Sequence, residues 1–350
     1  MDAKLSQKFK NYTKHPFFGF IVFGLILLII PFAKDIIGVT LTDAIAKTLI
    51  FYVVALGFSL LIGYAGLASL GTAAFIGIGT FLLYSIMNVF NLPFIAVIII
   101  GLIVAILLGL IFGGVSLRIE GMYLAIVTLG LSEIAVELFK NFDQFTGGVS
   151  GTTFTGIELF GFSLNSQQTL ILIIVAVVGT MMLTHNLIRS PFGRALLSIK
   201  NSDSAAQAMG ISILVYRLMA FVLSTIYALF GGVLYMAYVK FSMGSQWNLS
   251  VSLNLLAAVV VGGAKSIWGV LIGTFVIFGL DLAVFKTIPF LRDSQFSNMS
   301  FVISGILIII VMMYFPGGLI GLFKDLYMKI KLKISNKKLS KEAVLDENND

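Results

Sequence analysis

Long apolar blocks, separated by short polar connections, make up most of this chain. Their apolar residues are continuous rather than alternating, which excludes the strands of a membrane barrel. Most blocks approach the roughly 17 to 25 residues that a membrane-spanning helix needs. The pattern predicts an all-α polytopic membrane protein with about ten transmembrane segments, some of them interrupted by glycine. The blocks are residues 17–32, 44–62, 70–87, 93–116, 121–139, 168–187, 213–238, 251–261, 267–285 and 301–315.

The composition agrees with a protein embedded in lipid. The chain has 350 residues, of which 59% are hydrophobic and 11% charged, whereas soluble chains are about 45–50% apolar and about 25% charged. The absence of cysteine excludes disulfides and thiolate metal sites, and His15 and His185 are far apart in sequence, which argues against a metal centre. The net charge of +7 does not indicate nucleic-acid binding, because the basic residues sit at the ends of the blocks.

The distribution of lysine and arginine predicts the orientation and the domain boundaries. Residues 1–16 form a lysine-rich cytoplasmic segment, and the first block lacks a following small-residue cleavage site, so we expect it to be a retained span. Residues 17–323 form the transmembrane domain, and residues 324–350 a charged, solvated tail. An even number of crossings places both termini and the polar loop 189–212 in the cytoplasm, together with most basic residues.

The polar loop 189–212 is amphipathic and lies between two long apolar blocks. Phe192, Leu196 and Ile199 recur at helical spacing, and Asp203 or Ser204 is positioned to cap a second short helix. Helices this short bury little surface alone, which favours a projection offered to a partner over an ordinary basic loop. The residues predicted to carry this contact are Ser190, Pro191, Phe192, Gly193, Arg194, Asp203, Ala205, Ala206 and Gly210.

Two glycine-rich segments, 63–80 and 261–275, share the tetrapeptide Ile-Gly-Thr-Phe and suggest an internal repeat. The neighbouring block 251–261 is short for a span, so it is either a half-helix or continues from Asn248. Small residues allow close helix packing, and they also allow unwinding around a central pathway; both interpretations stay open. The candidate pathway residues here are Gly63, Gly66, Ser69, Thr72, Gly262 and Gly263.

Polar residues inside the apolar blocks are few. Glu133 lies deep in the block 121–139, where a carboxylate is costly unless it faces the bundle interior or water. It either binds an ammonium group or is hydrogen-bonded near the outer interface, and we favour the structural role. Asn254 is the polar candidate on the block 251–261.

The longest polar connection on the opposite side is 140–167, with the glycine-rich stretch 146–152. It predicts either an ordered turn or a contact with an external protein. No phosphate-binding loop is recognisable, because the stretch 262–266 lacks the Gly-Lys-Ser/Thr order. We therefore expect the energy for any transport to come from another subunit or an ion gradient.

Several stretches resemble the permeases of binding-protein-dependent ABC importers, and among them the branched-chain amino acid permeases of the LivM type. The sequence departs from that pattern at Thr72, where the family usually has His, and at Ser150 and Asn254, where an acidic residue is expected. These departures leave the residues that touch substrate unassigned. The resemblance rests on residues 63–80, 117–134, 190–196, 205–210, 261–269 and 315–319.

The resemblance implies a non-enzymatic transmembrane subunit that moves leucine, isoleucine and valine by alternating access in a prokaryotic plasma membrane. It implies that the loop 189–212 docks on an ABC ATPase subunit, so ATP is bound by that partner and this chain needs no cofactor. A second permease subunit, in a heterodimer, and an extracytoplasmic substrate-binding protein complete the implied assembly.

Two alternatives stay open. Members of the same importer family carry urea, sugars or nucleosides, because fold alone does not define the ligand. The second alternative is an ion-coupled secondary transporter, which would depend on Glu133, Glu137 and Asp281 as coupling residues. It would leave the loop 189–212 unexplained.

Overall fold

The computed structural model describes residues 16–33, 38–116, 122–159, 162–279 and, nearer the end, 305–306, 309, 313 and 318–321. The predicted N-terminal segment, the charged tail and Asp281 lie outside these residues, as does most of the predicted last span, 301–315.

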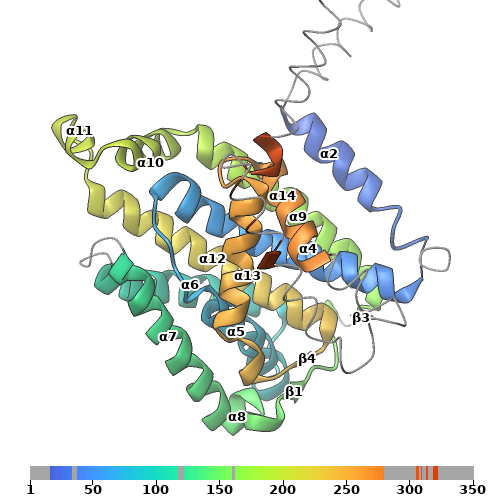
Figure 1. The fold of residues 1–350 in the computed structure, drawn as a ribbon. Coiled ribbons are helices and arrows are strands. Elements are labelled where there is room, and N and C mark those ends of the chain that lie inside the picture. The colour runs from blue at the N-terminus through green and yellow to red at the C-terminus, as the bar shows by residue number, and fades with distance from the viewer. Residues whose placement is uncertain are drawn as a thin grey trace, which may run out of the picture.

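The described chain is almost wholly helical, as the prediction of an all-α protein requires (Figure 1). Its strands are two residues long each and form two small antiparallel pairs, β1 with β4 and β2 with β3. The longer helices are α2 (Pro16–Leu27), α4 (Val39–Ser59), α5 (Thr72–Tyr84), α6 (Phe94–Ser116), α7 (Met122–Asn141), α9 (Ser166–Arg189), α10 (Pro191–Asn201), α12 (Ile213–Val239), α13 (Leu249–Gly262) and α14 (Ile267–Thr274).

Short elements join or extend these helices. π-Helical turns prolong α4, α5 and α14, and five short elements follow α7 in the connection to α9. The short elements are η1 (Leu60–Ala65), η2 (Ser85–Val89), α8 (Asp143–Thr146), η3 (Gly148–Ser150), β1 (Thr152–Thr153), β2 (Glu158–Leu159), β3 (Phe162–Ser163), α11 (Asp203–Ala208), β4 (Phe241–Ser242), η4 (Gly244–Gln246) and η5 (Phe275–Gly279).

Five helices of the described chain are long and apolar enough to cross a membrane. Helix α13 is not among them: it has 14 residues and begins after Asn248, whose side chain accepts a hydrogen bond from the Ser250 amide. The predicted block 251–261 therefore does continue from Asn248. The resulting helix of 14 residues is still too short for a complete membrane span. The total number of spans and the sidedness of the termini stay predictions. The five candidates are Val39–Ala65, Thr72–Val89, Phe94–Val115, Ser166–Arg189 and Ile213–Val239.

Helices α4 and α12 form the centre of the bundle, and α5 and α6 pack against α12. Glycines permit the closest crossing: a Cβ at Gly79 of α5 would collide with the carbonyl of Leu229, and one at Gly232 of α12 with that of Ile76. Helices whose backbones come this close are held together by van der Waals packing, because lipid offers no hydrophobic driving force for their association. The spanning window of α4 is accordingly 83% buried.

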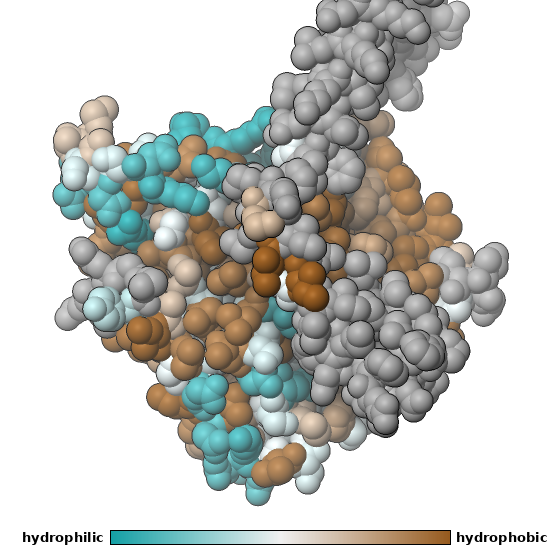
Figure 2. All heavy atoms as spheres, in the orientation of Figure 1, coloured by the Kyte–Doolittle hydropathy of each residue, from teal (hydrophilic) through white to brown (hydrophobic). Residues whose placement is uncertain are grey.

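The periphery is apolar between two polar ends. Figure 2 shows hydrophilic side chains gathered at the upper left, over α10 and α11, and at the bottom, near α8, with hydrophobic surface between them. The window of α6 is only 28% buried despite the highest hydropathy of the five. Such a surface is suited to lipid. Its exposed large side chains include Ile95, Ile98, Ile99, Leu102, Ile103, Leu107, Leu110 and Ile111.

Candidate functional site

The polar loop folds as two short helices, α10 and α11, at one end of the bundle (Figure 1). Ser190 occupies the N-cap position of α10 and Pro191 its first turn, a position that suits proline because no intrahelical N–H is needed there. Leu196 and Ile199 are buried, as their helical spacing predicts. The ring of Phe192 stacks on Tyr216 of α12, with the centroids 6.1 Å apart. Helix α10 therefore rests on the bundle through its apolar face.

Close contact at the start of α10 depends on a glycine. A Cβ at Gly193 would collide with the carbonyl of Ile188, at the end of α9. Arg194, on the exposed side, donates from Nη1 to the carbonyl oxygen of Arg189 over 2.9 Å. The arginine therefore closes the corner between α9 and α10.

Helix α11 is capped by a different residue from those predicted. Ser202 is its N-cap and accepts a hydrogen bond from the Ala205 amide at 3.3 Å, whereas Asp203 already lies in the first turn. Ser202 has the extended backbone that an N-cap needs. Gly210, with a φ of 79°, follows the helix in the left-handed conformation, in agreement with the prediction that it ends this segment.

An ion pair fixes α11 to the start of α12. Arg217 Nη2 lies 3.0 Å from both carboxylate oxygens of Asp203. Ala206 is buried, whereas Ala205 is exposed and Met209 is 82% exposed. Helices α10 and α11 together thus form a small, partly apolar tip, and the ion pair attaches this tip to α12.

The first glycine-rich segment breaks the path from α4 to α5. Helix α4 continues into η1, Gly66 follows with a φ of 72°, and the chain is not helical again until α5 begins at Thr72. Ser69 and Thr72 are buried at this break. Glycine adopts this left-handed conformation without the strain that a Cβ would introduce.

Side chains from distant helices satisfy the amides exposed by this break. The Leu70 amide donates to Thr128 Oγ1 of α7 at 2.9 Å, and the Ala73 amide to Ser252 Oγ of α13 at 3.0 Å. Unwound backbone at membrane depth is tolerated where the protein supplies such partners. The break is therefore an ordered feature of the fold.

The second glycine-rich segment forms a tight turn between α13 and α14. Gly263 has a φ of 106°, and Ser266 Oγ caps α14 by accepting from the Gly269 amide at 3.2 Å. The two helices approach so closely that a Cβ at Gly262 would collide with the carbonyl of Gly269, and one at Gly273 with that of Ala258.

The two breaks meet at the end of the bundle that carries α10. A Cβ at Gly63 would collide with the carbonyl of Ala264, and the Tyr64 hydroxyl donates to the carbonyl of Lys265 at 3.0 Å. Lys200, from α10, donates from Nζ to the carbonyl of Gly63 at 2.9 Å. The structure thus brings Gly63, Gly262 and Gly263 together with the polar loop. Sequence reasoning missed Lys200 and Tyr64, because nothing local marks a lysine that binds distant carbonyls.

Glu133 and Asn254 lie apart from this junction. Glu133 is exposed on α7, and Asn254 is partly buried on α13. Among the described residues Glu133 has no hydrogen-bonding or ion-pair partner. Whether this carboxylate binds an ammonium group stays a prediction.

The connection at the opposite end is an ordered turn. Thr146 donates to the carbonyl of Phe142 at 2.8 Å and accepts from the Gly148 amide at 3.2 Å. The pairing of β1 with β4 then places Thr152 opposite Ser242. A contact of this turn with an external protein stays a prediction.

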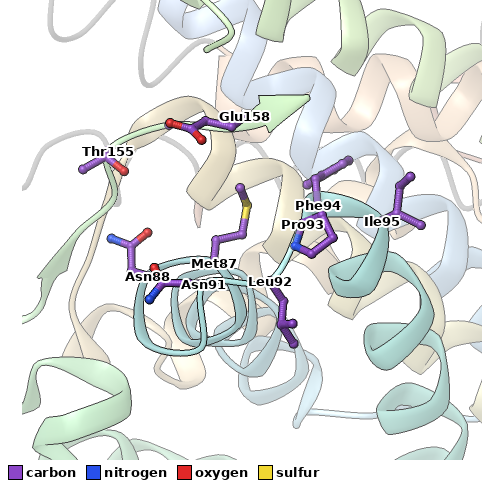
Figure 3. A pocket seen from close by; sticks show the side chains of 10 residues that line it. Met87, Asn88, Asn91, Leu92, Pro93, Phe94, Ile95, Thr155 and Glu158 are labelled. Carbon is purple, nitrogen blue, oxygen red and sulfur yellow. The ribbon is translucent and has the colours of Figure 1, made fainter. Parts of the chain in front are cut away.

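A pocket of about 620 Å³ with a mixed polar and apolar lining lies between η2, the start of α6 and the segment that leads into β2. Figure 3 shows Asn88 and Thr155 on one side of the opening and Pro93, Phe94 and Ile95 on the other. Glu158 also lines it. None of the predicted site residues belongs to this pocket.

Apolar helices long enough to span a membrane, glycine-mediated crossings and ordered helix breaks indicate a multi-pass membrane protein. A family model described as branched-chain amino acid transport system, permease component, matches residues 40–312. The chain belongs to this family.

Individual relatives agree with the assignment. The chain is 29% identical over 316 residues to the high-affinity branched-chain amino acid transport system permease protein LivM of Escherichia coli, a match that covers 83% of this chain and 72% of the relative. It is 24% identical over 311 residues to a probable LivM of Methanocaldococcus jannaschii, covering 77% and 90%. A probable LivH of that archaeon is 26% identical over 206 residues, covering 57% and 64%. No solved structure matches the chain.

Proposed function

We propose that this chain is the transmembrane permease subunit of an ABC importer and moves leucine, isoleucine and valine across a prokaryotic plasma membrane. A separate ATPase subunit drives alternating access, so the chain itself holds no cofactor. The observation that carries this proposal is the pair α10–α11, which lies at one end of the bundle and is hydrogen-bonded through Lys200 to the end of the first interrupted helix. The names of the relatives support the substrate class.

The geometry of the tip suits docking on an ATPase. Met209 and the exposed alanines Ala205 and Ala208 offer apolar contact, and the ion pair between Asp203 and Arg217 resists bending of α11 away from α12. A push on the tip therefore moves the start of α12, one of the two central helices. A loop without these contacts would deform under the same force and would leave α12 in place.

A second permease subunit completes the proposed pathway. Glu133 is exposed on α7, four residues before the exposed Glu137, and a carboxylate that faces lipid tails is costly. A protein partner that covers this face, with a shared aqueous cavity, removes that cost. The likeness to both LivM and LivH proteins supports a heterodimer. An extracytoplasmic binding protein then delivers substrate at the end opposite α10.

Co-purification tests the ATPase assignment. The tagged chain, extracted from its own membranes, is expected to retain a phosphate-loop ATPase that mass spectrometry identifies. Met209→Asp places a charge on the tip without a buried contact, and it is expected to remove the ATPase. Val149→Asp is the matched control, because Val149 is 76% exposed at the opposite end of the bundle. Equal ATPase recovery with both variants would contradict docking at α10–α11.

The same preparation identifies the substrate. A captured binding protein is titrated with leucine, isoleucine, valine, urea and nucleosides. Tight binding of the branched-chain amino acids supports the proposal. Selective binding of urea or a nucleoside would instead assign the chain to the urea or nucleoside transporters of the same importer family.

A further inference from the structure

Lys200 joins the polar loop to the first interrupted helix. Its side chain leaves α10 and donates from Nζ to the carbonyl of Ile62 at 2.8 Å and to that of Gly63 at 2.9 Å. These partners are 138 and 137 residues away along the chain. The contact is therefore a direct bridge between the tip and the end of the path α4–η1.

The two carbonyls are suitable acceptors for a cation. Carbonyl groups in the last turn of a helix lack the amide partners that interior groups have, and the helix dipole places partial negative charge there. The helix ends at once beyond them, because Gly66 is left-handed. A Cβ at Gly66 would lie 3.4 Å from Lys200 Cγ, so the stem of the lysine runs alongside the break.

No carboxylate competes for Lys200 in the described chain. The ion pairs found there are Lys140 with Glu137 and Arg217 with Asp203. Partial burial, and then repulsion from Lys265, lower the pKa of the Lys200 ammonium. The two carbonyls are the acceptors that the described chain supplies to this ammonium, and the residue as a whole is exposed. Hydrogen bonds from a charged donor are stronger than those between neutral groups.

The bridge reaches the second break as well. Gly63, whose carbonyl Lys200 binds, lies against Ala264, and the next residue, Tyr64, donates to the carbonyl of Lys265, so the turn between α13 and α14 contacts the same end of η1. A displacement of α10 is thereby passed to α4, α13 and α14 together.

We propose that Lys200 is a positioning residue that transmits movement of α10–α11 to the two glycine-interrupted segments. The transmission rests on the proposed function, since an ATPase must supply the movement. The bridge itself does not depend on that function, and the two are tested separately.

Hydrogen exchange of the purified chain in detergent tests the bridge. In Lys200→Met the amides of residues 60–71 are expected to exchange about tenfold faster than in the unmodified chain, because the end of η1 loses its donor. Lys200→Arg keeps a cation of similar reach and is expected to restore most of the protection. Lys265→Met is the control: it removes a neighbouring lysine whose side chain makes no hydrogen bond in the described chain. Unchanged exchange in Lys200→Met would overturn the bridge.

Reconstituted assemblies test the transmission. Lys200→Met is expected to hydrolyse ATP yet to import at least about tenfold less leucine per ATP, whereas Lys200→Arg and Lys265→Met stay near the unmodified ratio. An unchanged ratio in Lys200→Met would refute the transmission even if the bridge exists. If the unmodified chain recruits no ATPase, the proposed function fails and the transmission with it, while the exchange measurement still decides the bridge.

Discussion

The two glycine-interrupted segments look alike in sequence and differ in structure. At the first, the chain leaves the helix at Gly66 and stays irregular until Thr72. At the second, a turn of a few residues separates α13 from α14, and the two helices then pack backbone to backbone at Gly262. In the first segment the conformational freedom of glycine permits unwinding, whereas in the second its lack of a side chain permits contact.

The difference arises from residues that neither segment contains. The hydroxyl groups that satisfy the first break come from Thr128 and Ser252, whose partners are 58 and 179 residues away in sequence. At the second break the amide of Gly269 is capped locally by Ser266, and the distant side chain of Tyr64 donates to the carbonyl of Lys265 instead of accepting from an amide. A glycine pattern therefore indicates where a membrane helix is interrupted, while the tertiary neighbours decide how.

The largest expected effect is steric, at the second break. In Gly262→Val the side chain collides with the carbonyl of Gly269, and the variant is expected to lose about 3 kcal/mol or more of stability. Thermal unfolding in detergent, followed by fluorescence and gel filtration, measures the loss. Gly179→Val is the control, because a Cβ at Gly179 meets no neighbouring atom. Equal unfolding temperatures for the two variants would contradict the close approach of α13 and α14.

A smaller and local effect is expected at the first break. Ser252→Ala leaves the buried Ala73 amide without its acceptor, which costs about 1 to 3 kcal/mol. Exchange of amides at the start of α5 is expected to rise while that of α14 is unchanged. Ser250→Ala, on the exposed side of the same helix, is expected to leave both unchanged. Protection of α5 that survives Ser252→Ala would show that this hydroxyl does not support the break.

The smallest effect is expected where the breaks touch. Tyr64→Phe removes only the hydrogen bond to the carbonyl of Lys265, and polar contacts within membrane proteins contribute on average about 0.6 kcal/mol. Chemical unfolding should resolve this small loss when it is compared with Tyr123→Phe, because Tyr123 is 68% exposed. A loss several times larger would mean that the junction carries far more of the stability than its contacts indicate.

Hydropathy predicted where the helices lie, but it did not predict which helices are buried in the bundle and which are exposed on its surface. Helices α4 and α6 both appear in sequence as apolar spans, yet the window of one is 83% buried and that of the other 28%. In lipid the two environments are nearly equally apolar, so hydrophobicity alone does not separate them. Close helix packing was one of the two interpretations of the glycines in 63–80, such as Gly79, whereas Gly232 of α12, on the other side of this crossing, was not among the predicted residues.

The site was predicted in part. Helical spacing located α10, and Gly210 marked the end of the second short helix, because local geometry determines both. The cap was placed one or two residues too late, since Ser202, Asp203 and Ser204 are all good capping residues and only the backbone distinguishes them. The role of Lys200 depends on a contact 137 residues away and has no local signature.

Uptake of labelled leucine by reconstituted vesicles tests the central claim most directly. Vesicles contain this chain, its co-purified permease and ATPase partners and the binding protein, with or without ATP. We predict uptake only with ATP, and its loss when Met209→Asp separates the tip from the ATPase. Leucine uptake by this chain alone, driven by an ion gradient and indifferent to Met209→Asp, would contradict the account and establish a secondary transporter instead.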